Sequence, residues 1–204
     1  MKDQVNPPGL YVVGTPIGNL QDLSDRAKQI LSEVDWIAAE DTRETAKLLN
    51  AFAIQKTLIS LHEHSTKQKI LELKERLQAG ERGAYVSDAG TPGISDPGAA
   101  LVKACHEAEI QVIPVPGPSA VSTLLSACGF DASAFTFKGF FPREKADRKA
   151  WAEEVARQGG VQVFFESPHR VKECLHFLAE NFPNEILVMG RELTKKFETI
   201  LIWI

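Results

Sequence analysis

The segment SDAGTPGISDPG, residues 87–98, decides the fold because it places three glycines and two prolines directly after the apolar run Ala84-Tyr85-Val86. Glycine lets the backbone approach a ligand closely and adopt positive φ, whereas proline fixes φ and removes a donor. The segment is therefore predicted to be a rigid, shaped loop at the end of a β-strand, which is typical of a binding site.

Two further loops have the same build. GTPIGN (14–19) follows the apolar run LYVV, and PVPGPSA (114–120) follows QVI. Three such loops at the exits of three predicted strands indicate one crevice lined by all of them, as in open α/β sheets.

The first 115 residues alternate apolar runs with helical patterns, which is the signature of βα units and a mostly parallel sheet. Amphipathic helices are predicted around Leu23–Leu31 and Ile70–Leu77. We expect strands over 10–14, 35–40, 57–61, 84–88 and 111–115.

The prolines at 114, 116 and 118 cannot all lie inside one ordinary element, so we place a domain boundary there, with domains 1–117 and 118–204. The second domain is predicted to be a smaller α/β domain with a mixed sheet. Its helices are expected over 119–128, 145–158 and 168–181, and its strands over 135–141, 161–166, 185–190 and 198–204.

The composition excludes several classes of protein. With 204 residues and 44% hydrophobic content the chain can bury a sizeable core, but no window approaches the roughly 18 apolar residues of a membrane span. The N-terminus lacks an apolar secretory region, so we expect a cytoplasmic protein with no membrane partner. Cys105, Cys128 and Cys174 lack metal-like spacing and are expected to be buried free thiols, with no metal site.

The net charge of −4 gives no global footprint for nucleic-acid binding, so any RNA contact must come from a local patch. Neither glycine loop matches G-x-G-x-x-G, and Pro16 and Pro92 interrupt the turn that would cradle a pyrophosphate. A phosphate-binding P-loop is also lacking. The sequence predicts a ligand held by backbone groups and shape.

Charged residues stand at three predicted strand-to-helix turns. Asp41 and Glu44 fit a helix-capping pattern, which leaves Glu40 and Arg43 open to a functional role. Asp96-Pro97 predicts a helix with Asp96 as N-cap and Pro97 at its first position. Ser167-Pro168 is a similar helix-start signal and stands beside Glu166, His169 and Arg170. The histidine is interpreted as a surface residue.

Six blocks taken in order resemble the tetrapyrrole methylase superfamily, and within it the branch that methylates small-subunit ribosomal RNA. The resemblance runs from about Leu10 to Ile200, over GTPIGNL (14–20), AAEDTRET (38–45), VSDAGTPGISDPG (86–98), PVPGPSA (114–120), FFESPHR (164–170) and RELTKKFET (191–199). It implies a two-domain α/β enzyme, usually a homodimer, that binds S-adenosylmethionine between its domains. The absent phosphate cradle agrees with such a cofactor.

Carried over residue by residue, the resemblance implies cofactor contacts at Pro16, Ile17, Gly90, Thr91, Ile94, Ser119, Ala120 and Phe165. The candidate general bases are Asp41, Asp88 and Glu166, in no order that the sequence decides. Phosphates of the RNA are expected on Arg43, Arg170 and Arg191. The dense cluster Arg143, Lys145, Arg148 and Lys149 supplies either a second RNA contact or a solvated helix face.

The implied function is 2′-O-methylation of a cytidine in 16S ribosomal RNA of the small subunit. Two alternatives stay open: methylation of a small corrin-type substrate, or an inactive truncated domain that binds the ribosome. The family normally continues into a further helix and a last strand, whereas this chain stops at residues 201–204, LIWI. This end is read as an ordinary terminal strand, as a truncation, or as a surface buried in a dimer.

Overall fold

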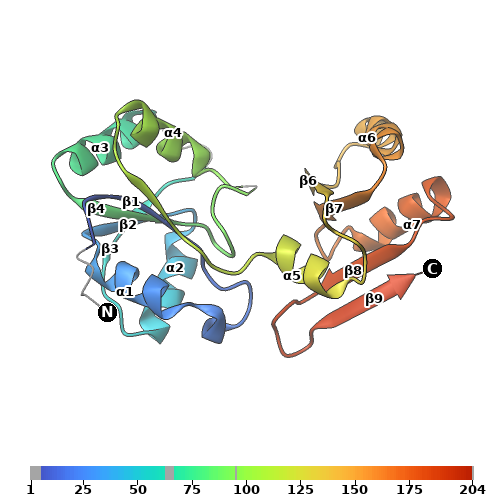
Figure 1. The fold of residues 1–204 in the computed structure, drawn as a ribbon, viewed down its shortest axis with the longest axis horizontal. Coiled ribbons are helices and arrows are strands. Elements are labelled where there is room, and N and C mark those ends of the chain that lie inside the picture. Colours follow the sequence, from blue (N-terminus) through green and yellow to red (C-terminus); the bar gives the residue numbers. More distant parts are fainter. Residues whose placement is uncertain (1–5, 63–66, 95, 204) are drawn as a thin grey trace. The chain divides into compact units, whose positions relative to one another are not determined.

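The computed structural model describes residues 6–62, 67–94 and 96–203, and the chain divides into two units, Met1–Ser119 and Ala120–Ile204 (Figure 1). We had placed the boundary after residue 117. Each unit is described by itself below.

Unit 1 is built on five parallel strands in the order β3-β2-β4-β1-β5. The mostly parallel sheet predicted from the sequence is confirmed, since every pairing in it is parallel. The strands are β1 (Gly9–Val13), β2 (Trp36–Ala39), β3 (Thr57–Ser60), β4 (Arg82–Val86) and β5 (Val112–Val115).

The helices of unit 1 cover both faces of this sheet: α1 (Asp25–Glu33) and α2 (Thr42–Ala51) on one face, α3 (Lys67–Gln78) and α4 (Ala99–Glu107) on the other (Figure 1). A short turn η1 (Leu20–Asp22) precedes α1. Helices α1 and α2 connect strands that step toward the β3 edge, and α3 and α4 connect strands that step back toward β5. Parallel crossovers share one hand, so the two directions require opposite faces.

The two hydrophobic cores of unit 1 lie on opposite faces of its sheet and receive alternate side chains of the strands. On β1, Tyr11 and Val13 belong to the core under α1 and α2, whereas Leu10 belongs to the core under α3 and α4. Successive side chains of a strand point to opposite faces, so a strand covered on both sides reads as a continuous apolar run.

Unit 2 contains α5 (Ala120–Ala127), β6 (Phe135–Phe140), α6 (Lys145–Gln158), β7 (Val161–Phe165), α7 (Val171–Asn181), β8 (Leu187–Arg191) and β9 (Thr199–Trp203). Strands β6 and β7 are parallel, and β8 and β9 form an antiparallel hairpin. The parallel and antiparallel pairings of the expected mixed sheet are thus both present, but in two separate two-stranded sheets. Its core centres on Phe141, Trp151 and Cys174.

Pro114 lies inside β5, as the predicted strand over 111–115 implies, and it fits there because β5 is an edge strand whose unpaired side needs no donor. The expected helix start at Pro97 was wrong. Helix α4 begins at Ala99 with Gly98 at the N-cap position, and not at Pro97. Ser95, in the predicted loop 87–98, and Ile204, in the predicted strand 198–204, lie outside the described residues. Across residues 6–62, 67–94 and 96–203, no helix is long and apolar enough to cross a membrane.

Candidate functional site

The three glycine-rich loops meet at the carboxyl edge of the sheet in unit 1. Thr15, after β1, and Gly90, after β4, exchange backbone hydrogen bonds of 2.9 and 3.1 Å. Thr91 Oγ1 donates to Pro118 O, 3.1 Å away in the loop after β5. Strands β4, β1 and β5 are neighbours, so their exits are bound to converge, and these bonds fix the three loops to one another.

Glycine is required where these loops touch. Gly90 has a φ of +84°, a left-handed conformation that favours glycine, and a Cβ there would lie 3.3 Å from Ile17 Cγ2. Gly14 and Gly117 face each other so closely that a Cβ on either would stand 2.7 Å from backbone atoms of the other.

The cofactor residues implied by the resemblance divide between the units. Pro16, Ile17 and Thr91 are half-buried in the joined loops, and Ser119 is half-buried at the end of unit 1. Ile94 presents an apolar side chain that is 41% exposed. Ala120 opens α5 and Phe165 ends β7, so both belong to unit 2. The structure thus brings Pro16, Ile17, Gly90 and Thr91 together in unit 1.

Sequence reasoning missed the role of Asp96 in the loop after β4. Its carboxylate accepts hydrogen bonds from the backbone N–H of Gly93, from the N–H of Gly98 at 2.8 Å and from Tyr85 Oη at 2.8 Å. Burial and the bond to this carboxylate raise the pKa of Tyr85. The Ser-Asp-Pro sequence could have indicated this role, but the sequence analysis interpreted Asp96 as the N-cap of a helix. Asp96 instead closes the loop that carries Ile94.

Asp41 and Asp88 lie at the ends of neighbouring strands β2 and β4. Asp88 Oδ1 accepts the backbone N–H of Asp41 at 2.9 Å. Asp41 is the N-cap of α2, as predicted, and accepts the N–H of Arg43 at 2.8 Å. The Arg43 guanidinium also binds this carboxylate, with Nη2 2.6 Å from Oδ2, and lowers the pKa of Asp41 to about 2.

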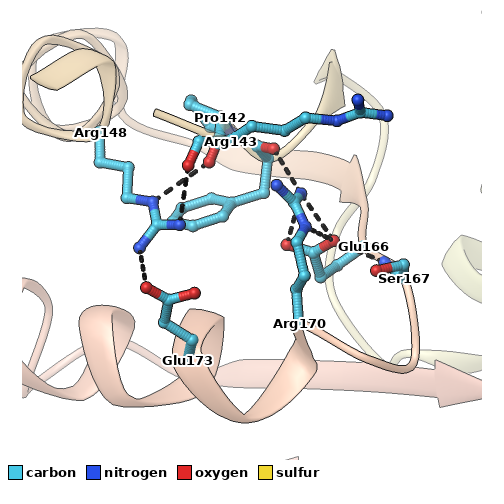
Figure 2. A network of polar contacts seen from close by, with 8 residues as sticks. Pro142, Arg143, Arg148, Glu166, Ser167, Arg170 and Glu173 are labelled. Atoms are coloured by element: carbon cyan, nitrogen blue, oxygen red, sulfur yellow. Dashed lines mark hydrogen bonds and ion pairs between the residues drawn. The ribbon is translucent and has the colours of Figure 1, made fainter. Parts of the chain in front are cut away.

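Glu166 and Arg170 form an ion pair in unit 2 (Figure 2). The Arg170 guanidinium donates to both oxygens of Glu166 at 2.7 and 2.8 Å and to the carbonyl of Phe141 at 2.8 Å. The Glu166 side chain, only 7% exposed, also accepts the N–H of Ser167 at 2.5 Å. The Glu166 carboxylate is therefore fully engaged and poorly suited to accept a proton, whereas the Arg170 Nη1 is buried without a hydrogen-bond partner among the residues that the structure describes.

Arg148 was expected either to contact RNA or to lie on a solvated helix face, but it is buried. It is 6% exposed, and its guanidinium donates to the carbonyls of Pro142 and Arg143 and to Glu173 Oε1, at 2.7 to 3.1 Å. Figure 2 shows it turned into this network, whereas the Arg143 side chain extends away from it. The helical spacing that groups the basic residues does not say which of them points inward.

The other cations expected to bind RNA are exposed: Arg43, Arg143, Lys145, Lys149 and Arg191. The three cysteines are buried free thiols, as predicted, and burial raises the pKa of Cys105 and Cys174 to about 11. Among the residues that the structure describes, no three His, Cys, Asp or Glu side chains gather as a metal would require.

The family model of the tetrapyrrole (corrin/porphyrin) methylases matches residues 9–203. The chain therefore belongs to the tetrapyrrole methylase family and is a methyltransferase, which confirms the resemblance seen in its sequence blocks.

Its similar relatives include the ribosomal RNA small subunit methyltransferase I of several bacteria. The Vibrio cholerae protein is 48% identical over 95% of this chain and 67% of its own length. The Xylella fastidiosa protein is 48% identical over 96% of this chain and 72% of its own, and the Escherichia coli O157:H7 protein is 45% identical over 94% and 67%.

Two solved structures share the fold. The methyltransferase CobJ has a TM-score of 0.70 at 19% identity, covering 96% of this chain and 85% of its own. Diphthine synthase has a TM-score of 0.71 at 14% identity, covering 95% and 80%. At these identities they confirm the α/β fold and leave the substrate undecided.

Proposed function

We propose that this protein transfers a methyl group from S-adenosylmethionine to a ribose 2′-oxygen of a cytidine in 16S ribosomal RNA of the small subunit. The observation that carries the proposal is the 48% identity, over 95% of the chain, to a ribosomal RNA small subunit methyltransferase I. We further propose that it acts in the cytoplasm as a homodimer, as the family resemblance implies.

The joined loops of unit 1 suit this methyl donor. They offer close backbone and apolar side chains, Ile17 and Ile94, and they contain no glycine turn for a pyrophosphate. The exposed carboxylate of Asp88 stands at the same edge of the sheet, where its negative charge favours a cation over a phosphate. Pro16, Gly90, Thr91 and Ser119 complete the proposed contacts in unit 1, and Ala120 and Phe165 contribute from unit 2.

When bound, S-adenosylmethionine supplies a methyl carbon that its positive sulfur already activates. The loops have to hold that carbon in line with the incoming oxygen, and alignment of this kind lowers a barrier by roughly 7–11 kcal/mol. The nucleophile is a neutral hydroxyl, so a carboxylate that takes its proton adds a further factor of about 10²–10⁴.

Asp88 is the carboxylate best placed for that proton. Glu166 is occupied by Arg170 and Ser167, and Asp41 by Arg43. Asp88 is exposed, and among the described residues only its Oδ1 takes a hydrogen bond, from Asp41. Its other oxygen is available to accept the hydroxyl proton directly or through a water molecule. We therefore assign the base to Asp88.

The proposal is tested by incubating the protein and labelled S-adenosylmethionine with small ribosomal subunits from a strain that lacks the modification. Label recovered in the RNA as a 2′-O-methylcytidine is the expected result. Protein that binds the cofactor but leaves the subunits unlabelled would contradict it.

The same assay addresses the first alternative, and calorimetry addresses the second. A corrin-type precursor offered in place of the subunits should stay unmethylated. An inactive ribosome-binding domain would show no cofactor binding, so calorimetry that finds a Kd of 1 μM or tighter, about −8 kcal/mol, rules it out.

A further inference from the structure

The turn between β8 and β9, residues 192–198, carries an exposed aromatic side chain together with two lysines and two glutamates. Phe197 is 70% exposed, more than any other large hydrophobic residue in the described parts of the chain. The Lys196 Nζ lies 5.5 Å from the centre of its ring. Neither Arg191, Lys195 nor Lys196 forms an ion pair with any residue that the structure describes, although many other lysines and arginines do.

The turn is held in one shape by its own hydrogen bonds. Lys195 N donates to Glu192 O at 2.9 Å, and Glu198 N donates to Lys195 O at 3.1 Å. Glu198 Oε2 accepts the N–H of Thr194 at 2.5 Å, so this carboxylate is bonded to the backbone of the turn. A fixed turn presents Phe197 with little loss of conformational freedom on binding. In Figure 1 this turn lies clear of α6 and α7.

We propose that Phe197 is a stacking platform for an unpaired base of the RNA substrate, with Lys195, Lys196 and Arg191 holding the adjacent phosphates. Single-stranded RNA is bound by aromatic side chains on which bases stack, combined with cations along the backbone. This inference rests on the proposed RNA substrate and names the residues that take it.

The surroundings of Phe197 favour RNA over a protein partner. Protein interfaces are depleted of charge at their centre, whereas this ring has the ammonium group of Lys196 beside it. The same hairpin offers a contrast at its far end, where Leu201, Ile202 and Trp203 are exposed and Trp203 pairs with Leu187. These exposed apolar side chains have the character of a protein contact, whereas the turn places its aromatic ring beside an ammonium group.

The test measures binding of a fluorescent, unstructured single-stranded RNA oligonucleotide and of the duplex of the same sequence. Phe197→Ala should weaken single-strand binding by about fivefold or more and leave duplex binding unchanged, because only unpaired bases can stack. Phe197→Trp should keep the affinity, and Phe197→Leu should lose it, because leucine is apolar but has no π-face. The matched control Ile202→Ala, on the same hairpin and 54% exposed, should bind like the unmodified protein.

The contribution of the two lysines is measured separately, by the salt dependence of RNA binding. Replacing Lys195 and Lys196 together by alanine should reduce the slope of log K against log salt concentration by about 1.4, since each phosphate contact of a single strand contributes about 0.7. Phe197→Ala should leave that slope unchanged.

Two results would overturn the proposal. One is single-strand binding that is absent in the unmodified protein or equal in Phe197→Ala. The other is affinity retained by leucine together with a change of oligomeric state in Phe197→Ala, which would assign the turn to a second copy of the chain. Methyl transfer to small subunits, measured on the unmodified protein, reports on the proposed function independently of either result.

Discussion

Gly14 and Gly117 lie backbone against backbone: a Cβ on Gly14 would stand 2.7 Å from Cα of Gly117, and one on Gly117 would stand 2.7 Å from the carbonyl carbon of Gly14. The two residues follow β1 and β5, which are neighbours in the sheet. The absence of both side chains lets the first and third loops touch. This contact and the Thr15–Gly90 bridge give the candidate cofactor site its shape.

Gly117→Ala should separate these loops. The added methyl meets backbone atoms that cannot rotate away, and overpacking of this kind typically costs about 1–3 kcal/mol of unfolding free energy. Urea denaturation should show that loss, and calorimetry should show weaker binding of S-adenosylmethionine. Gly80→Ala is the control, because Gly80 has a φ of +94° but open space around it. It should lose stability through backbone strain and keep cofactor affinity; equal affinity in both variants would exclude the loop contact from the cofactor site.

Asp88→Asn should lower the rate of methyl transfer by about 10²–10⁴ without weakening cofactor binding, since it removes the proposed base but can still accept the N–H of Asp41. Single-turnover transfer to small subunits measures the rate. Asp41→Asn is the matched comparison, because asparagine keeps the helix cap and Asp41 is already committed to Arg43. If Asp41→Asn loses as much rate as Asp88→Asn, the assignment of the base to Asp88 is wrong.

Arg148→Ala should lower the stability of the fold, whereas Arg143→Ala should lower the affinity for RNA. Arg148 donates to two carbonyls and a carboxylate, so its loss should cost about 2 kcal/mol of unfolding free energy. Arg148→Lys should not restore that stability, because an ammonium cannot reproduce the planar fork. Arg143 is exposed, so Arg143→Ala should leave the urea midpoint in place and weaken RNA binding with a shallower salt dependence. RNA binding weakened only by the Arg148 variants would reverse these roles.

The contrast between these arginines shows where sequence reasoning stops. Apolar runs and their spacing are enough to predict the five strands of unit 1, and the signal is clearest for β1, β2 and β4, because burial on both faces leaves a continuous apolar pattern. Whether an arginine beside a helix turns inward depends on acceptors that come from elsewhere. For Arg148 one of these acceptors is Glu173, 25 residues away.

The candidate site also has parts that could be predicted from the sequence and parts that could not. The glycine loops were visible because glycine and proline mark the backbone locally. The sequence did not show which of the three carboxylates is the general base, because that depends on which of them pairs with an arginine side chain. Arg43 is close in sequence to Asp41 and Arg170 to Glu166, yet i,i+2 and i,i+4 spacing is equally compatible with solvated side chains.

Tyr85→Phe should loosen the loop that carries Ile94. The change removes the hydroxyl that donates to Asp96 and keeps the ring that packs against Gly98. A hydrogen bond to a charged group contributes about 1.5–3 kcal/mol, and faster hydrogen exchange over residues 90–94 should accompany the loss of stability. Tyr11→Phe removes a similar buried hydroxyl, bonded to Pro7 O, on the same sheet. It should leave exchange in the 90–94 loop unchanged, and equal acceleration in both variants would contradict a role for Asp96 in closing the loop.

The acid titration of Asp41 tests the electrostatics of the β2 exit. Its hydrogen bonds to Arg43 lower its pKa from 3.8 to about 2 in the folded protein, so folding favours the charged form. The resulting stabilisation is complete above about pH 5 and is lost as the pH falls toward 2. An NMR titration should give the low value in the unmodified protein and a higher pKa in Arg43→Gln, which lacks the guanidinium. Lys47→Gln is the control, since Lys47 pairs with Glu44, and it should leave the pKa of Asp41 near 2. An Asp41 pKa near 3.8 in the unmodified protein would mean that Arg43 is free to hold RNA.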